Sequence, residues 1–551
     1  STTEATEDPV RLAGESFSGS PTSGTPVRDS GSSAPANSAA QSRRLTRLQK
    51  GVTQPLNYKH MSKYGLVCSI DAQAQPRTLD EAFGDEKWRK AMMEEYVALR
   101  KNKTRHLVSP QQGKNLIDCK WVFRIKRKSD GTIDRYKARL VARGYSQTYG
   151  IDYDETFAPV AKMNTVRILV SCAANFGWPL HQLDVKNAFL HGELKEEVYM
   201  EVPPGLDSSK TEGKVCRLKK SLYGLKQSPR AWFDRFRRAM CEMGYKQCNK
   251  DHTVFYRHQN RKIVILAVYV DDIIITGDDG TEIARLKECL GKAFEVKDLG
   301  QMKYFLGIEI ARSAKGIALS QRKYTLDLLS DMRMLGCRAA TTPIDQNHKV
   351  TAQSGDLVDK EKYQRLVGRL LYLCHTKPDI AYVVSIVSRY MHEPRSGHVE
   401  AAHRILKYLK GTPGRGLWFE GNGHLVVDGY SDADWASCLD DRRSTSGYCV
   451  FVGGNLVSWR SKKQPVVSKS TAEAEYRAMS QGLSEMLWVR NLLSELKVLR
   501  KDPLNVCNVN KSVISVTNNP IQHDRTKQVK IDRFFIKEKV DDGTIKISHV
   551  S

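Results

Sequence analysis

The sequence predicts an α+β protein that is built from several hydrophobic cores. At 551 residues the chain is too long for a single core, and 40% of its residues are hydrophobic, which is enough to fill several. Segments with strand-like and helix-like patterns alternate through the middle of the chain, up to about residue 347. A helical region at about 359–410 and a strand-rich segment at 425–459 follow. Length alone suggests roughly three or four units.

The first part of the chain, residues 1–74, is predicted to be a disordered basic linker. Residues 1 to about 40 consist mainly of Ser, Thr, Gly, Pro and Ala, and they cannot bury enough apolar surface to fold. The basic stretch Ser42–Gly51 and an irregular segment follow. Because the chain starts at Ser1 and not at methionine, we expect it to be a piece of a longer protein.

The ordered part is predicted to begin near Thr78, with a helix and then a two-stranded hairpin. Thr78 and Glu81 form a capping box, and four apolar side chains at helical spacing follow on one face: Trp88, Met92, Tyr96 and Leu99. Apolar and basic residues alternate from Trp121 to Lys126, as in a half-buried strand. Asp130-Gly131 supplies a turn, and the returning strand places three cations on one face: Lys137, Arg139 and Arg143.

The charge and the cysteine content favour an intracellular protein that binds polyanions. Lys plus Arg number 87 against 62 Asp plus Glu, and the formal net charge of +25 favours nucleic acid over a neutral small substrate. A basic protein without such a partner is the alternative. The twelve cysteines include no C-x-x-C pair, which argues against zinc ribbons. The most apolar run, Ile263–Gly277, contains two aspartates, so we expect no membrane span.

Two adjacent carboxylates, Asp271 and Asp272, stand between apolar runs. Ile263–Val268 precede them and Ile273–Ile275 follow, which predicts a hairpin with acids at its tip. Unpaired buried carboxylates are very costly, so the pair makes sense as a site for a divalent cation. Asp184, at the end of another apolar-flanked segment, would complete a three-carboxylate site for two cations that promote phosphoryl transfer. A pair of solvated turn aspartates is the weaker alternative.

The order of several longer segments resembles the reverse transcriptase of copia-type retrotransposons. Three of them surround the acids: LDVKNAFLHG (Leu183–Gly192), SLYGLKQSPRAW (Ser221–Trp232) and YVDD (Tyr269–Asp272). KARLVARGYSQTYGIDYDETFAPV (Lys137–Val160) precedes them and YFLGIEI (Tyr304–Ile310) follows, in the order and spacing of that family. The resemblance extends from about residue 75 to the end of the chain.

This resemblance implies a right-hand polymerase, with fingers, palm and thumb over residues 75–345. A helical connection at 346–424 and an α/β RNase H-like domain at 425–551 would follow, the latter degenerate and truncated at its C-terminus. YFLGIEI would be the primer grip, and Ser320–Leu329 the thumb helix. The implied activity is RNA-directed DNA polymerisation with Mg²⁺ or Mn²⁺. The implied partners are an RNA template, a DNA or RNA primer, deoxynucleoside triphosphates (dNTPs) and an RNA–DNA hybrid. The life cycle of the family implies cytoplasmic particles that can enter the nucleus.

The resemblance also assigns roles to individual residues. Asp184, Asp271 and Asp272 would be the metal-binding catalytic triad. Six residues would form the dNTP site: Lys137, Arg139, Phe189, Tyr223, Gly224 and Gln227. Alternate residues of a strand share a face about 7 Å apart, a spacing that independently suits Lys137 and Arg139 to a polyphosphate. For Phe189, a gate against the ribose 2′-hydroxyl and an ordinary core residue are equally good interpretations.

Residues from 425 onward resemble the RNase H domain of the same family. Asp432, at the end of a strand, and Glu475, in a helix, would be acids of its site. Glu473 is close to Glu475 in sequence, but it forms a plausible capping box with Ser470 and is therefore interpreted as structural.

The third acid of that second site is missing. Val509 occupies the position where the family has an aspartate, and no Asp or Glu lies between Asp502 and Asp524. Farther on, a histidine, an acid and a histidine of the family pattern are replaced: Gln528, Lys530 and Phe534. Asp532 is a candidate substitute ligand. We therefore expect an intact polymerase triad and an impaired RNase H.

Two other functions are compatible with the sequence. A catalytically inactive retrotransposon remnant that only binds nucleic acid is favoured by the changes near residues 509 and 530, and disfavoured by the three intact polymerase acids. A binding protein adopted by the host, which uses the basic fingers and the RNase H surface, is the other. Salt-sensitive binding without nucleotide incorporation would favour either of them over a polymerase.

Overall fold

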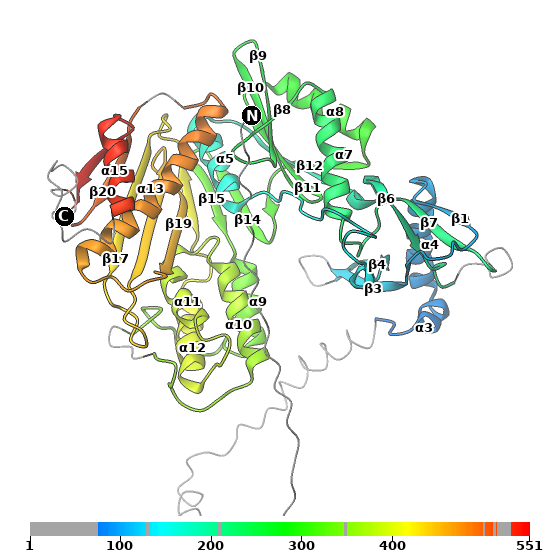
Figure 1. Ribbon diagram of the computed structural model, residues 1–551, viewed down its shortest axis with the longest axis horizontal. Helices are drawn as coiled ribbons and strands as arrows, with labels where there is room; N and C mark the ends of the chain where they lie inside the picture. The colour runs from blue at the N-terminus through cyan, green and yellow to red at the C-terminus, as the bar shows by residue number, and fades with distance from the viewer. Residues whose placement is uncertain are drawn as a thin grey trace, which may run out of the picture. The chain divides into compact units, whose positions relative to one another are not determined.

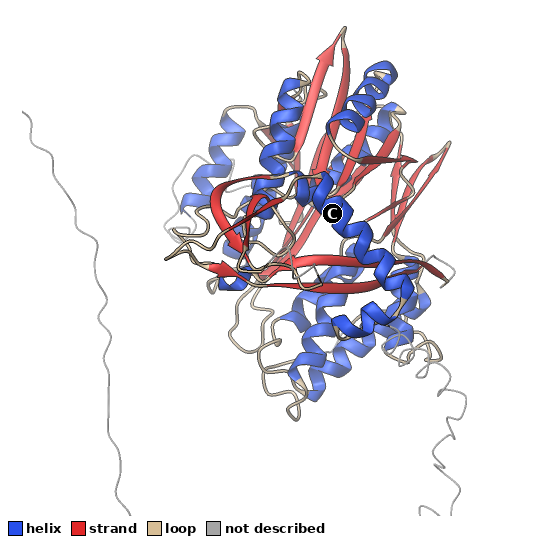
Figure 2. Ribbon diagram, turned by 90° about the vertical axis from the view of Figure 1, so that its right-hand side faces the viewer, coloured by secondary structure: helices blue, strands red, loops and turns tan. Residues whose placement is uncertain are grey.

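The computed structural model describes residues 75–127, 132–205, 212–345, 350–499, 502–510, 514 and 530–550. Residues 75–551 group into one unit that mixes helices and strands (Figures 1 and 2). The predicted linker 1–74, the turn at Asp130-Gly131 and Gln528 lie outside the described residues.

The first two helices are set by capping side chains. α3 (Leu79–Gly84) follows Thr78, whose hydroxyl accepts a hydrogen bond from the Glu81 N–H at 3.2 Å, which confirms this half of the predicted capping box. The Glu81 carboxylate accepts from the Arg77 N–H at 2.7 Å, one residue before the position expected for the other half. Asp85 ends α3 and caps α4 (Glu86–Lys101) with a 2.8 Å bond to a first-turn N–H. The single predicted helix is therefore two helices, because a cap residue interrupts it.

The predicted hairpin is formed by β3 (Cys119–Arg127) and β4 (Ile133–Ala142), which pair antiparallel. Trp88 on α4 is 1% exposed and packs α4 onto this hairpin. It meets two aromatic rings edge-on, with ring centroids 5.3 and 4.9 Å away: Phe123 and Tyr136. A second, four-stranded sheet shares a core with the hairpin, in the order β1 (Arg105–Val108), β7 (Val215–Lys220), β6 (Glu193–Met200) and β2 (Leu116–Ile117).

A six-stranded sheet carries the acids. Its strands lie in the order β12 (Val296–Gln301), β5 (Leu180–Val185), β11 (Asp272–Gly277), β10 (Lys262–Tyr269), β9 (Val254–Gln259) and β8 (Lys246–Gln247). Three helices pack around it: α5 (Met163–Phe176), α7 (Ser228–Glu242) and α8 (Gly280–Ala293). The 3₁₀ turn η2 (Ala188–His191) follows β5.

Both faces of the β10–β11 pair are buried, which explains the uninterrupted apolar runs. Ile273 and Ile275 enter the core beneath α7 and α8, whereas Ile274 enters the opposite core with α5. Alternate strand residues point to opposite faces, so two-sided burial requires every position to be apolar. Ile263–Gly277 is thus a pair of strands. No helix in the described ranges is long and apolar enough to cross a membrane.

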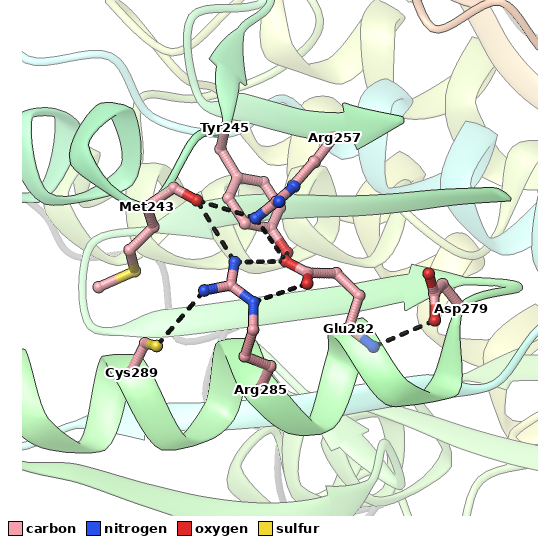
Figure 3. Close-up of polar contacts among 7 residues, drawn as sticks. All are labelled: Met243, Tyr245, Arg257, Asp279, Glu282, Arg285 and Cys289. Carbon is pink, nitrogen blue, oxygen red and sulfur yellow. Dashed lines mark hydrogen bonds and ion pairs between the residues drawn. The ribbon is translucent and has the colours of Figure 1, made fainter. Parts of the chain in front are cut away.

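A polar cluster on Glu282 ties α8 to the sheet and to the end of α7 (Figure 3). The buried Glu282 carboxylate accepts hydrogen bonds from the Arg285 guanidinium at 2.7 Å and from the Tyr245 hydroxyl at 2.9 Å. Arg257 on β9 lies 3.3 Å from the same carboxylate and also donates to the Met243 carbonyl after α7. The cluster therefore joins three elements behind the acid-bearing hairpin.

Another sheet joins distant parts of the chain. It consists of β13 (Tyr304–Phe305), β14 (Ile308–Ser313), β15 (Gly316–Ser320) and β16 (Leu417–Glu420). The turn between β13 and β14 uses Leu306 and Gly307, with φ of 47° and 76°. β16 returns after the helical region and pairs antiparallel with β15.

Four helices form a single bundle: α9 (Arg322–Asp331), α10 (Lys360–Leu373), α11 (Ala381–Ser388) and α12 (Ser396–Gly411). Leu328 and Leu329 of α9 lie in the same core as the apolar side chains of α10–α12. The boundary predicted at 345/346 falls inside this bundle, because a ten-residue helix such as α9 cannot bury its apolar face alone. α12 ends at Gly411, close to the predicted end of the helical region at about residue 410.

The C-terminal part is a five-stranded sheet with a long helix. The strand order is β19 (Asn455–Lys463), β18 (Thr445–Val452), β17 (Val427–Asp434), β20 (Leu504–Asn508) and β21 (Ile545–His549). The pairs β17–β20 and β20–β21 are parallel, and the others are antiparallel. α13 (Thr471–Glu495) packs on β17 and β18, and α15 (Lys530–Asp541) packs on α13.

Most of the core of this C-terminal sheet is continuous with that of the acid-bearing sheet, apart from a small cluster of Ala433, Ala474 and Ala478. Val450 and Tyr476 belong to the same buried cluster as Val166 of α5 and Ile274 of β11. The hydrophobic core therefore continues across the boundary that was predicted at 424/425.

Candidate active site

The two adjacent acids lie at the tip of the β10–β11 hairpin. Tyr269 and Asp272 are register partners, so Val270 and Asp271 form a two-residue turn. Val270 has φ of 56°, a left-handed conformation that is unusual for a β-branched residue. Asp184 on β5 is the direct register partner of Asp272. Residues directly opposite in an antiparallel pair share a face, so these two carboxylates lie side by side.

The strained turn is held from α7 and from β5. The indole N–H of Trp232 donates to the Val270 carbonyl at 2.7 Å, and the Val185 N–H donates to the Asp271 carbonyl at 2.8 Å. Trp232 is 2% exposed. The sequence showed Trp232 only as part of a family-like segment, and it contained no signal for this contact.

Asp271 and Asp272 lie in an environment that disfavours their ionised forms. Partial burial raises the pKa of Asp272, a 2.9 Å hydrogen bond from the Gln182 amide lowers it, and Asp271 and Asp184 raise it further. Desolvation also raises the pKa of Asp271, Asp184 adds to this, and Arg139 lowers it. Gln182 is 6% exposed and is a site residue that sequence reasoning missed.

The donor set fits a hard divalent cation. Carboxylate oxygens are the ligands that Mg²⁺ prefers, and their mutual repulsion would be relieved by a cation. Across the described ranges, no three His, Cys, Asp or Glu side chains form a ready-made metal cluster. Mg²⁺ is usually held by one or two carboxylates together with water and substrate phosphates, so the three acids suit a cation that arrives with a phosphorylated ligand.

Four of the six predicted nucleotide-site residues lie together next to the acids. Lys137 and Arg139 are half-buried on β4, and the Arg139 guanidinium lies 4.3 Å from the centre of the Tyr223 ring. Phe189 meets the same ring edge-on at 5.4 Å. Burial lowers the pKa of Lys137, and Arg139 lowers it further. The pKa of Asp271 responds to both cations, so their field reaches the acids.

Gly224 supports this group through its backbone. It has φ of 94°, and a Cβ added there would lie 2.0 Å from the Ala142 carbonyl oxygen at the end of β4. The Ala142 N–H donates to the Tyr223 carbonyl at 2.7 Å. Only glycine allows this close approach of the two segments.

Gln227 is placed differently from the rest of the group. It is 2% exposed, donates to the Asp152 carbonyl at 2.9 Å and accepts from the Gln147 amide at 3.0 Å. Because the N–H and the oxygen of the Gln227 amide both bond to other residues of the protein, this side chain holds the loop at 147–152 in place. A direct nucleotide contact by Gln227 stays a prediction that this arrangement does not favour.

A second pair of acids lies at the end of β17. Burial raises the pKa of Glu475 to about 7, an Asn508 hydrogen bond lowers it, and Asp432, which is hydrogen-bonded to Glu475, raises it. Asn508 is 1% exposed and donates to Glu475 Oε2 at 3.3 Å and to the Ser431 carbonyl at 3.2 Å. Sequence reasoning missed Asn508, which is the last residue of β20.

The remaining predicted residues of the second site do not join this pair. Val509 follows Asn508 and is 51% exposed. Asp532 lies half-buried in the first turn of α15, and none of the contacts described joins it to Asp432 or Glu475. Glu473 accepts from Arg477 at 2.7 Å and from a backbone N–H before Ser470, which agrees with its structural interpretation.

Comparisons with known proteins agree with the sequence resemblance. Residues 102–346 match the family model described as Reverse transcriptase (RNA-dependent DNA polymerase). In Arabidopsis thaliana, the Retrovirus-related Pol polyprotein from transposon RE1 is 43% identical over 92% of this chain and 34% of its own length. The corresponding polyprotein from transposon RE2 is 41% identical over 96% of this chain and 36% of its own length.

One further relative is covered over its full length, and a solved structure is also similar. A transposon Ty5-1 protein of Saccharomyces cerevisiae is 33% identical, covering 55% of this chain and 100% of that protein. The solved structure of the foamy viral protease–reverse transcriptase dRH in complex with double-stranded DNA is 13% identical, with a TM-score of 0.46 over 85% of this chain and 70% of that chain. The chain spans about a third of the length of the two plant polyproteins, at 34% and 36%. The chain belongs to the copia-type retrotransposon Pol polyproteins and contains their reverse transcriptase domain.

Proposed function

We propose that the chain is an RNA-directed DNA polymerase that extends a primer on an RNA template with dNTPs. The observation that carries this proposal is the register pairing of Asp184 with Asp272 beside Asp271, within the field of Lys137 and Arg139. Carboxylates facing cations in this way suit a reaction in which a triphosphate is held by cationic side chains and attacked next to acid-bound metal ions.

The three aspartates would hold Mg²⁺ or Mn²⁺. Bound there, the cations would stabilise the charge that develops at the transferred phosphoryl group and activate the primer hydroxyl. The residues of the chain keep the carboxylates in place: Trp232 fixes the turn through Val270, and Gln182 favours the ionised form of Asp272.

Lys137 and Arg139 would bind the triphosphate. Both project from β4, and the lowered pKa of Lys137 reflects burial beside another cation, a combination that an incoming polyanion relieves. The contact of Arg139 with the Tyr223 ring limits the positions that the guanidinium can take. An oriented guanidinium is well suited to phosphate because it offers several donors in a fixed plane.

Phe189 and Tyr223 would form the wall next to the sugar and base of the incoming nucleotide. Their edge-on contact keeps the Phe189 ring from moving freely, which a gate against a 2′-hydroxyl requires. Gly224 would let this wall approach β4 closely, and Gln227 would position the loop below it.

In this proposal the β3–β4 hairpin serves as fingers, the six-stranded sheet as palm, and the α9–α12 bundle as thumb. The β13–β14 hairpin would be the primer grip. The single core of α9–α12 supports a thumb that includes residues first assigned to a helical connection.

The C-terminal sheet, with strand order β19-β18-β17-β20-β21, would be an RNase H-like domain with impaired hydrolysis. Asp432 and Glu475 are hydrogen-bonded to each other, and Asn508 and Val509 stand where a third carboxylate is needed. A site with two carboxylates, one of them with a raised pKa, holds divalent cations less well than three ionised carboxylates. An RNA–DNA hybrid would still be the ligand of this surface.

The second candidate is an inactive remnant that binds nucleic acid without copying it. The observations in its favour are Val509 and Lys530, since a chain that has lost acids of one site can have lost activity at the other. The presence of all three acids, Asp184, Asp271 and Asp272, argues against an inactive remnant.

The deciding experiment is incorporation of labelled dNTPs on a primed RNA template with Mg²⁺. We expect incorporation by the chain and its loss in Asp271→Asn. Asp541→Asn, the same chemical change at an exposed position of α15, is the matched control and should retain incorporation. If the chain is folded by circular dichroism but none of the three proteins incorporates nucleotide, the polymerase proposal fails and the inactive remnant is favoured.

A further inference from the structure

Helix α5 is enclosed on all sides. Ten of its fourteen residues are buried. Four polar residues recur along it at helical spacing and form one stripe, the α5 stripe: Asn164, Arg167, Ser171 and Asn175. In a helix at the surface of a domain, such a stripe faces water. Here it faces the C-terminal sheet, so the two sides of α5 are covered by different parts of the chain.

Three members of the α5 stripe have a partner in the C-terminal sheet, and the fourth, Asn175, has one in the segment that leads into it. Arg167 is 4% exposed, donates to the Val457 carbonyl at 2.7 Å, and lies 4.0 Å from the centre of the Trp459 ring. The other three members bond across the same interface at 2.9, 2.7 and 2.9 Å: Asn164 to Ser458, Ser171 to the Val452 carbonyl, and Asn175 from the Asn422 N–H. Losing these partners would leave buried polar groups unsatisfied.

A second contact lies away from the α5 stripe. Glu495, the last residue of α13, accepts from the Asn249 N–H at 2.7 Å and from the Lys250 N–H at 3.2 Å. Trp488, two helical turns earlier, donates to the Lys250 carbonyl at 3.0 Å. These bonds fix the turn before β9, the neighbour of β10 in the acid-bearing sheet.

The enclosed helix connects the C-terminal sheet to the acids. α5 contacts both β19 and β11, and β11 begins with Asp272. Ile265 and Ile274, on the back of the acid-bearing hairpin, share one buried cluster with Val450 of β18. Figure 1 shows α5 between β19 and the strands of the acid-bearing sheet.

We propose that the C-terminal sheet and α13 act as a fixed scaffold for the polymerase site, a function separate from any chemistry of Asp432 and Glu475. The inference rests on the proposed polymerase function. The contacts that carry it involve neither acid of the second site, and the Val509 change leaves them intact. A close-packed interior transmits displacement, so a shift of α5 would reach Asp272 through β11.

The test uses the full chain and extension of a DNA primer on a DNA template, where no RNA strand exists for a nuclease to act on. We expect Arg167→Met and Glu495→Gln each to lower the extension rate at saturating dNTP by about 10-fold, because small misplacements of catalytic groups have large effects on rate. Hydrogen exchange in peptides that cover 180–185 and 272–277 should become faster in both variants. Arg490→Met is the control, since Arg490 on α13 donates to the Thr544 carbonyl within the C-terminal part.

Either of two results would overturn the scaffold proposal. Rates and exchange like those of the unaltered chain in both variants, or equal losses in Arg490→Met, would show that α5 does not depend on this interface. If Arg167→Met fails to fold, Glu495→Gln, at the half-buried rim, decides alone. If the unaltered chain does not extend any primer, the polymerase proposal fails, and the exchange comparison still supports or overturns the scaffold.

Discussion

Replacing Trp232 by phenylalanine should slow nucleotide incorporation about 10- to 100-fold while the chain stays folded. The substitution removes the indole N–H that donates to the Val270 carbonyl at 2.7 Å. It keeps an aromatic ring in the cluster that Trp232 forms with Phe236 and Phe294, at centroid distances of 5.6 and 5.2 Å. The change is therefore directed at the acid-bearing turn more than at the core.

The magnitude follows from what this hydrogen bond opposes. A β-branched residue in the left-handed region stores on the order of 1–3 kcal/mol of backbone strain, and Val270 has φ of 56°. Net loss of one hydrogen bond costs about 0.5–1.5 kcal/mol, which is enough to let the turn relax. Asp271 would move with it, and a displacement of about 1 Å can lower a catalytic rate about 100-fold.

The assay is steady-state incorporation, with kcat and KM for dNTP measured separately, together with the urea midpoint of unfolding. We expect kcat to fall and KM to change little, because Trp232 holds the acids and not the nucleotide-site residues. Trp178→Phe is the matched control: Trp178 is 8% exposed and lies in the core on the other side of the sheet. The reasoning is refuted if Trp232→Phe keeps at least half of kcat, or if both variants lose activity equally.

Three further substitutions test other parts of the structure. Glu282→Gln should lower the free energy of unfolding, measured by urea titration, by about 1–3 kcal/mol at neutral pH. The Arg285 hydrogen bond holds the pKa of Glu282 below 4.5, so the difference in stability between the two proteins should have its full size above pH 4.5 and should vanish as the pH falls. Burial lowers the pKa of Lys377 to about 8. The unaltered chain should therefore gain about 3 kcal/mol of stability relative to Lys377→Met as the pH rises from 8 towards 10.5. Plots of stability against pH that run parallel for the two proteins would contradict this. Val509→Asp should raise Mg²⁺-dependent cleavage of the RNA strand of a hybrid about 10-fold or more, whereas Val509→Asn, which lacks the charge, should not.

The acid-tipped hairpin could be predicted because its signal is local. Burial on both faces makes every residue from Ile273 to Ile275 apolar, and the two acids interrupt that pattern where the strands turn. The caps at Thr78 and Ser470 are equally local, because a side chain bonds to an N–H three residues ahead. Such patterns follow from the geometry of a single element.

The contacts that position the site could not be predicted in this way. Trp232 lies 38 residues from Val270, and Gln182 lies 90 residues from Asp272. No periodicity marks such pairs, because they depend on how separate elements pack. The apolar side of α9 is likewise completed by helices that follow a long connection, so its core partners beyond 345/346 left no local signal. The role of Gln227 as a brace for the loop also became visible only with its partners.

The buried cluster shared by α5 and the C-terminal sheet has a consequence for biosynthesis. It contains both Val166 and Ile545, which are 379 positions apart (545 − 166). At ribosomal rates of about 5–20 residues per second, the last strand emerges roughly 20–75 s after the helix it helps to enclose. During that interval the nascent chain exposes apolar surface, which makes it prone to aggregation. A stop codon that removes the C-terminal strands would therefore leave this cluster open, even where the codons for Asp184, Asp271 and Asp272 are intact.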